Sequence, residues 1–275
     1  MYVEGDDFSD YPFPIVKIIG IGEIGEKTLK KFSNSDFYNE YKHTQMNLQL
    51  YSLTYKTSDQ EIENLIYDSD WIFVIADYKN SELARKIEQS YKCHLKTNLF
   101  LFPTVEDIKI DEIKKDFGTV IALPEDKISE TRFTKHELIT KIITMILYTV
   151  SWKTLVGLDF IAVIEVMKNS GIMYVGIGEG LKGDLPINVV KKSLKSPLML
   201  CDTNKSSKFL INFVGDTEEF SMKEISESIN FIEKFYTQKI VDDFDYGKLD
   251  ISYFWQVCVE RNSNEISVII IASDS

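Results

Sequence analysis

The sequence predicts a mixed α/β fold built around a mostly parallel sheet. Short apolar runs rich in β-branched residues alternate along the chain with helical patterns, which is the order of βαβ units. The chain has 275 residues, 44% of them hydrophobic, enough for one large domain or two moderate ones. Its longest helical pattern, from Phe133 to Trp152, is apolar around most of its circumference. Such a helix is buried on several sides, so we expect it to run between two halves of the molecule.

The first half opens with the apolar run Ile15 to Gly20, a glycine-rich turn and a helical pattern from about Gly25 to Phe32. Residues 1 to 14 precede it as a polar, acidic extension. Four more strands are predicted, at Leu48 to Tyr55, Trp71 to Ala76, Leu99 to Phe102 and Val120 to Leu123. Helices are predicted at Glu61 to Tyr67 and at Glu82 to Tyr91. Strands alternating with helices predict a mostly parallel sheet.

The second half continues the alternation and ends with two strands. Helices are predicted at Phe160 to Lys168, Leu185 to Leu194 and Met222 to Phe235, and strands at Ile172 to Gly176 and Phe209 to Val214. The last two strands, Phe254 to Glu260 and Glu265 to Ala272, flank the turn residues Asn262 to Asn264. This pattern predicts a β-hairpin.

The charge balance excludes some partners. The chain carries 31 Lys plus Arg against 43 Asp plus Glu, a net charge of −12. This argues against a nucleic-acid or anionic-membrane surface but leaves a local phosphate site open. The three cysteines share no CxxC spacing, and we expect buried thiols in a reducing compartment. No signal peptide or bilayer-spanning run is present, so we expect a cytoplasmic protein that does not insert into a membrane. His43 and His94 have no ligand-spaced neighbours, so no metal site is expected.

The sharpest local motif is the GxGxxG run Gly20-Ile21-Gly22-Glu23-Ile24-Gly25, which follows a predicted strand and opens a helix. Such glycines let a backbone turn tightly and let a phosphate approach the helix N-terminus. A Rossmann site for NAD or NADP also needs an acid at the end of the second strand, and Leu53 to Thr57 contains none. The alternative is a turn that only packs helix on strand. Glu23 and Glu26 favour that alternative, because they would direct negative charge toward a phosphate.

The order of segments from Ile15 to Ala272 resembles the FtsZ/tubulin superfamily. IVKIIGIGEIGEKTL, starting at Ile15, resembles the family's first strand and first nucleotide loop. Val156 to Val163, followed by GIMYVGIGEG, resembles the loop, helix and strand after the family's central helix. Four downstream segments keep the family's order: SPL at Ser196, FLINFVG, MKEISESINFI and the closing VIIIAS. The resemblance implies a nucleotide-binding domain at 15–130, a central helix at 131–156 and a C-terminal domain at 157–275, after an extension at 1–14.

The second nucleotide loop departs from the family. The resemblance implies a GGGTGTG loop after the third strand, but Ala76 to Glu82 contains no glycine. Asp77 and Glu82 add negative charge where a phosphate would lie. Backbone N–H groups cannot close round a phosphate without glycine geometry, so we expect this loop to have lost its phosphate-binding role. Asn80 or Ser81 would then serve to cap the following helix.

The catalytic loop is also incomplete. The family's Asn-x-Asp-x-x-Asp pattern, which enters the neighbouring subunit's site, corresponds here to Gly157, Asp159 and Ala162. Asp159 is therefore a residual catalytic candidate, and its alternative role is to cap the helix that begins at Phe160. Only one of the family's two catalytic carboxylates is present. The orientation of the attacking water, an effect worth ~10²–10⁴ in rate, would therefore be mostly lost.

Glu137 also has two interpretations. It falls where the family reads guanine with an acid on the central helix. It also completes a capping box with Thr134, next to Phe133 and Leu138 as a hydrophobic staple. The candidate nucleotide contacts are therefore Gly20, Ile21, Gly22, Glu23, Gly25 and Glu137.

These expectations lead to three hypotheses. The first is a pseudo-GTPase that holds GTP or GDP weakly or not at all and self-associates head to tail, or modulates filaments of a true FtsZ. The second is an active GTP-binding, polymerising GTPase with atypical loops. The third is an NAD(P)-dependent oxidoreductase. The family's tether-binding C-terminal tail does not follow the last predicted strand, so recruitment by that route is not expected.

Overall fold

The computed structural model describes residues 14–41, 46–77, 81–92, 97–103, 115–150, 154–156, 158, 160–201, 208–216, 221–241, 252–259 and 264–274. The strands are β1 (Ile15–Ile21), β2 (Asn47–Leu53), β3 (Trp71–Ile75), β4 (Thr97–Pro103), β5 (Thr119–Leu123), β6 (Thr154–Val156), β7 (Gly171–Leu181), β8 (Lys208–Gly215), β9 (Ser252–Val259) and β10 (Glu265–Asp274). The helices are α1 (Gly22–Ser33), α2 (Asp36–Tyr41), α3 (Asp59–Tyr67), α4 (Ser81–Lys92), α6 (Glu125–Ser129), α7 (Lys135–Tyr148), α8 (Phe160–Met167), α9 (Pro186–Leu194) and α10 (Met222–Val241).

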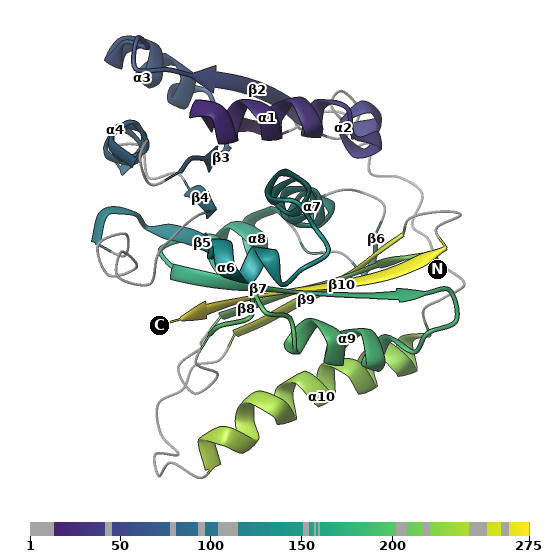
Figure 1. The fold of residues 1–275 in the computed structure, drawn as a ribbon. Helices are drawn as coiled ribbons and strands as arrows, with labels where there is room; N and C mark the ends of the chain where they lie inside the picture. Colours follow the sequence, from purple (N-terminus) through teal and green to yellow (C-terminus); the bar gives the residue numbers. More distant parts are fainter. Residues whose placement is uncertain are drawn as a thin grey trace, which may run out of the picture.

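The described strands form one ten-stranded sheet in the order β2-β1-β3-β4-β5-β7-β10-β8-β9-β6 (Figure 1). Its first six strands, from β2 to β7, are all parallel to one another. β10 is antiparallel to both β7 and β8, β9 is parallel to β8, and β6 is antiparallel to β9. The α/β fold with a mostly parallel sheet, predicted from the alternation of patterns, is confirmed.

Helices cover both faces of the sheet, as two apolar clusters show. One cluster joins side chains of α3, α4, α9 and α10 to one face of the strands. The other joins side chains of α1, α2, α6, α7 and α8 to the opposite face. Within β1, Ile19 and Ile21 belong to the first cluster and Val16 and Ile18 to the second. This alternation follows from the two-residue period of a strand.

The predicted hairpin between the last two strands is wrong. β8 lies between β9 and β10, so these strands are not neighbours. Asn262 and Ser263 of the predicted turn lie outside the described part of the chain. The long helix α10 instead connects β8 to β9 in parallel. β10 is buried from Ile266 to Ser273, and a strand buried over most of its length suits the middle of a sheet, between β7 and β8.

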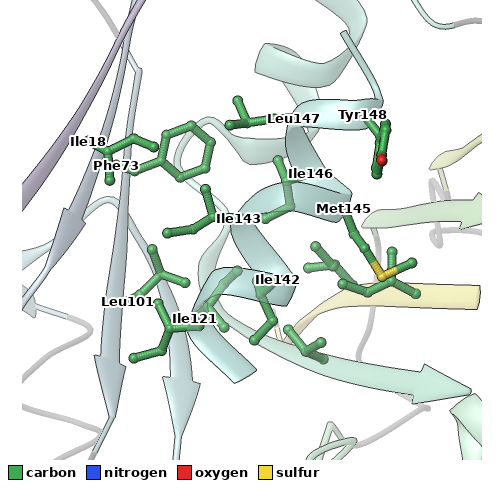
Figure 2. Close-up of a cluster of buried hydrophobic side chains, with 14 of the residues drawn as sticks. Ile18, Phe73, Leu101, Ile121, Ile142, Ile143, Met145, Ile146, Leu147 and Tyr148 are labelled. Carbon is green, nitrogen blue, oxygen red and sulfur yellow. The ribbon is translucent and has the colours of Figure 1, made fainter. Parts of the chain in front are cut away.

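The central helix is shorter than its apolar pattern predicts. α7 spans Lys135–Tyr148, and Trp152 lies outside the described residues. Its side chains share one cluster with strands from both halves of the sheet. Figure 2 shows Ile143 directed toward Phe73 and Leu101, while Met145 lies on the opposite side of the helix. Burial on both sides explains why the apolar pattern extends round the helix.

Both ends of α7 are attached to other elements. At its start, Lys31 of α1 donates to Glu137 at 2.9 Å. At its end, the buried Asn212 of β8 donates to the carbonyl of Met145 at 2.7 Å, and the Cys258 thiol of β9 donates to the carbonyl of Tyr148 at 3.3 Å. Burial raises the pKa of Cys258 to about 12, so the thiol keeps the proton that it donates. Side chains from the C-terminal strands thus satisfy carbonyls that the helix end leaves without helical partners.

Candidate functional site

The strand order places a topological switch point at the carboxyl ends of β1 and β3. From β1 the chain continues to β2 on one side, and β3 then pairs with the other side of β1. In open α/β sheets, ligands bind at such a switch point, outside the carboxyl ends of the strands. The GxGxxG motif lies there, because β1 ends at Ile21 and α1 begins at Gly22.

Two of the motif's glycines are required by packing alone. A Cβ on Gly20 would lie 2.7 Å from the carbonyl carbon of Gly25, and a Cβ on Gly25 would lie 2.5 Å from the Cα of Gly20. The same Cβ on Gly25 would lie 3.1 Å from the carbonyl oxygen of Ile75 in β3. Gly20 and Gly25 therefore allow α1 to approach the sheet, whether or not a ligand is bound. This favours the packing interpretation for these two positions.

Gly22 and the start of α1 have a different role. Gly22 has φ 68, in the left-handed region that glycine adopts without strain. The N-cap, Ile21, is extended and makes no side-chain capping hydrogen bond. The first-turn N–H groups of α1 thus receive no acceptor from the N-cap side chain, and such groups suit an anion.

Negative side chains occur in the first turns of α1 and after the end of β3. Glu23 lies exposed in the first turn of α1, and a hydrogen bond from Lys27 lowers the pKa of its carboxyl. Glu26 accepts a hydrogen bond from Ser52 Oγ at 3.4 Å, at the end of β2. After β3, Ala76 is buried and Asp77 is half-buried, and Glu82 is exposed in the first turn of α4. Residues 78–80 of the second loop lie outside the described chain, so the loss of its phosphate-binding role stays a prediction.

Glu137 forms the predicted capping box. Its Oε2 accepts from the backbone N–H of Thr134 at 3.0 Å and from Thr134 Oγ1 at 2.9 Å. Its Oε1 accepts from Lys31 Nζ at 2.9 Å. The Thr134 amide and the Lys31 ammonium together lower the pKa of Glu137 to about 2. Lys31 lies nine residues after Gly22, roughly 13 Å along the helix, so Glu137 contacts the far end of α1. Its predicted contact with guanine stays a prediction.

A contact that the sequence analysis did not find joins α1 and α7 between these points. Thr28 Oγ1 lies 3.0 Å from His136 Nδ1. Burial and the neighbouring lysine ammonium groups lower the pKa of His136, so the imidazole is neutral at pH 7. The two residues are 108 positions apart, and no local pattern reports a contact at that separation.

The catalytic candidate Asp159 lies outside the described residues, as does Gly157. Between them, the N–H of Leu158 lies 3.4 Å from Gln256 Oε1 of β9. α8 begins at Phe160, where the sequence predicts it, and Ala162 is half-buried on that helix. Both roles considered for Asp159 therefore stay predictions.

A cavity of about 220 Å³ lies away from the glycine motif, between the α6–α7 connection, β7 and α9. Glu179 lines it, 2.5 Å from Arg132 and 2.7 Å from Lys141. Burial alone raises the pKa of Glu179, but hydrogen bonds from these two cations outweigh burial and lower it. No sequence motif indicated that these three charged residues lie together. Among the described residues, no group of His, Cys, Asp and Glu could hold a metal ion, and no helix is long and apolar enough to cross a bilayer.

Sequence comparison finds distant relatives named as cell division proteins. The chain is 26% identical over 210 residues to FtsZ 2 of Thermococcus kodakarensis, covering 64% of this chain and 50% of the relative. It is 23% identical over 206 residues to FtsZ 1 of Archaeoglobus fulgidus, covering 66% and 55%. The chain thus spans about half the length of the curated relatives it matches. No family model matches the chain.

Solved structures match over nearly the whole chain. An empty FtsZ dimer from M. jannaschii has a TM-score of 0.73 at 15% identity, covering 97% of this chain and 90% of that one. A GTPγS-bound protofilament of CetZ2 from Haloferax volcanii has a TM-score of 0.70 at 11% identity, covering 94% and 92%. GDP-form protofilaments of Bacillus thuringiensis TubZ have a TM-score of 0.64 at 12% identity, covering 94% of this chain and 88% of that one.

At these identities the structural matches show the fold, which is that of the FtsZ- and tubulin-like proteins. The chain is thus distantly similar in sequence to archaeal FtsZ and shares the FtsZ fold.

Proposed function

We propose that the chain is a pseudo-GTPase of the FtsZ type, which acts as a filament component or filament modulator and hydrolyses GTP poorly or not at all. The observation that carries the proposal is the negative charge at the switch point. Glu23 and Asp77 lie at the carboxyl ends of β1 and β3, where a family member would hold phosphates. The absence of glycine from Ala76 to Glu82 supports the same conclusion.

Self-association is the second part of the proposal. The FtsZ, CetZ2 and TubZ structures that share the fold are a dimer and protofilaments. We propose that this chain associates head to tail with its own copies or with a true FtsZ. A head-to-tail contact is heterologous and leads to an open-ended filament.

The domain division and cellular location complete the proposal. We propose a nucleotide-type domain at 15–130, a central segment at 131–156 and a C-terminal domain at 157–275, although one sheet continues from β5 to β7 across them. We also propose a cytoplasmic location, which the buried thiols of Cys201 and Cys258, neither of them in a disulfide, support.

An active GTPase with atypical loops is the alternative. It is supported by the left-handed Gly22 and by the N-terminus of α1, whose N-cap side chain makes no capping bond. The NAD(P) hypothesis has less support, because no acid follows β2 between Leu53 and Thr57.

Nucleotide content separates these alternatives. Purified protein is denatured with acid, and the released small molecules are separated by chromatography. The proposal expects far less than one GTP or GDP per chain. Stoichiometric guanine nucleotide would overturn it in favour of the active GTPase, and tightly held NAD or NADP would favour the oxidoreductase.

Filament formation is tested separately by electron microscopy with and without GTP. The proposal expects assembly that does not depend on GTP, alone or with one of the archaeal FtsZ proteins that the chain resembles. Filaments that form only with GTP and disappear as it is consumed would contradict it.

A further inference from the structure

One end of the sheet is an edge strand whose sequence does nothing to prevent pairing. β2 pairs with β1, and no other strand in the described ranges pairs with its outer side. Figure 1 shows β2 at the upper end of the molecule. An edge strand presents a row of N–H and C=O groups that can pair with another strand.

The hydrogen-bond pattern identifies which groups face outward. The N–H of Asn47 donates to the carbonyl of Pro14 at 3.0 Å, next to β1. In a parallel ladder, alternate residues direct both backbone groups to the same neighbour. Asn47, Gln49, Tyr51 and Leu53 therefore bond to β1, whereas Leu48, Leu50 and Ser52 direct their backbone groups to the outer side.

Soluble proteins usually protect such an edge, and the other end of this sheet follows that rule. β6 has three residues and a register irregularity against β9. β2 has seven residues, NLQLYSL, without a charge or a proline. Lysine, proline, bulges and short length are the common means of blocking edge pairing, and β2 uses none of them.

Three polar side chains of β2, those of Asn47, Gln49 and Tyr51, form hydrogen bonds with one another. Gln49 Nε2 donates to Asn47 Oδ1 at 3.3 Å, and Tyr51 OH donates to Gln49 Oε1 at 2.7 Å. These bonds run along the strand and leave the outward backbone groups unchanged. None of the seven side chains of β2 is charged, although the whole chain has a net charge of −12.

We infer that β2 pairs with β2 of a second copy of this chain, antiparallel and about a twofold axis at Leu50. In this register the outward residues form hydrogen-bonded pairs: Leu50 with the partner's Leu50, and Leu48 with the partner's Ser52. The outward set is symmetric about Leu50, and self-complementarity of this kind is what a twofold contact requires. No like charges of the two strands meet.

This contact differs from the head-to-tail association proposed above and does not depend on it. The contact uses the same surface on both copies, so it produces a dimer and not an open chain. Between filaments, it would join two neighbouring filaments side by side.

Proline at position 52 tests the pairing. Ser52 is exposed and its N–H faces outward, so Ser52→Pro removes two intermolecular donors and leaves the β1 ladder intact. Sedimentation velocity over a wide concentration range, without nucleotide, is expected to show a dimer for the native chain and at least ~10-fold weaker association for Ser52→Pro. Ser52→Ala, which keeps the N–H, should dimerise like the native chain.

Two further measurements keep the test decisive if Ser52→Pro does not fold. Leu50→Lys places like charges opposite each other and should also yield monomers. Amide hydrogen exchange should show protection of Leu48, Leu50 and Ser52 that is lost on dilution. A native chain that is monomeric at all concentrations overturns the inference, whether these amides are unprotected or are covered by another part of the chain. Dimerisation that Ser52→Pro and Leu50→Lys leave unchanged also overturns it.

Discussion

Gly20 of β1 and Gly25 of α1 pack backbone against backbone, so closely that neither position has room for a Cβ. The contact sets the distance between the first helix and the sheet at the switch point. It shows that a GxGxxG pattern can be required by packing before any ligand is considered.

Replacement of either glycine should therefore destabilise the fold itself. Gly25→Ala is expected to lower the free energy of unfolding by ~1–3 kcal/mol, because the added methyl group must displace backbone. Urea unfolding in the absence of nucleotide measures this. Gly183→Ala is the matched control: its φ of +90 carries strain, but no atom lies within 4 Å of the added Cβ, so the loss should be nearer ~1 kcal/mol. A Gly25→Ala protein as stable as the native chain would contradict the packing role.

The capping carboxylate should make stability depend on pH. The pKa of Glu137 is lowered from its ordinary 4.5 to about 2 in the folded state, so its contribution is complete above the ordinary value. That contribution is lost as the pH falls from about 5 toward 2. Glu137→Gln should be less stable than the native chain at pH 7, and the difference should shrink as the pH falls through that window. Denaturant titrations at several pH values measure the difference in stability. Glu63→Gln, at an exposed position of α3, is the control. A difference that stays constant with pH would contradict the assignment.

Attachment of α7 to the C-terminal strands should depend on Asn212. Asn212→Leu keeps the side-chain size but leaves the Met145 carbonyl without its donor, which costs ~1–3 kcal/mol of stability. Thermal and denaturant unfolding measure the loss. Asn188→Leu, at an exposed position of α9, should change stability little. Equal stability of the two variants would show that the buried bond contributes nothing.

Restoration of one acid should not restore hydrolysis. Ala162→Asp adds the second carboxylate of the family's catalytic pattern, but the segment from Ala76 to Glu82 still lacks glycine. We expect phosphate release from GTP to stay at the level of the native chain, with Ala162→Asn as the uncharged control. A large gain from Ala162→Asp alone would show that the second loop binds phosphate after all.

Local patterns predicted the local structure well. The Thr134 to Glu137 capping box forms as expected, and the alternating apolar runs became strands and helices in the predicted order. Three short elements, α2, α6 and β6, were not predicted, since each is too short to show a clear period.

What the sequence by itself determined was therefore the α/β class, the order of its main elements, the capping box and the position of the glycine turn after β1, all of which depend on neighbouring residues. The tertiary structure alone decided that β10 lies between β7 and β8, that His136 meets Thr28 and that β2 ends the sheet. The physical reason is that a turn signal reports only the backbone near it. A strand's partners, in contrast, depend on which apolar surfaces across the whole chain can be buried together.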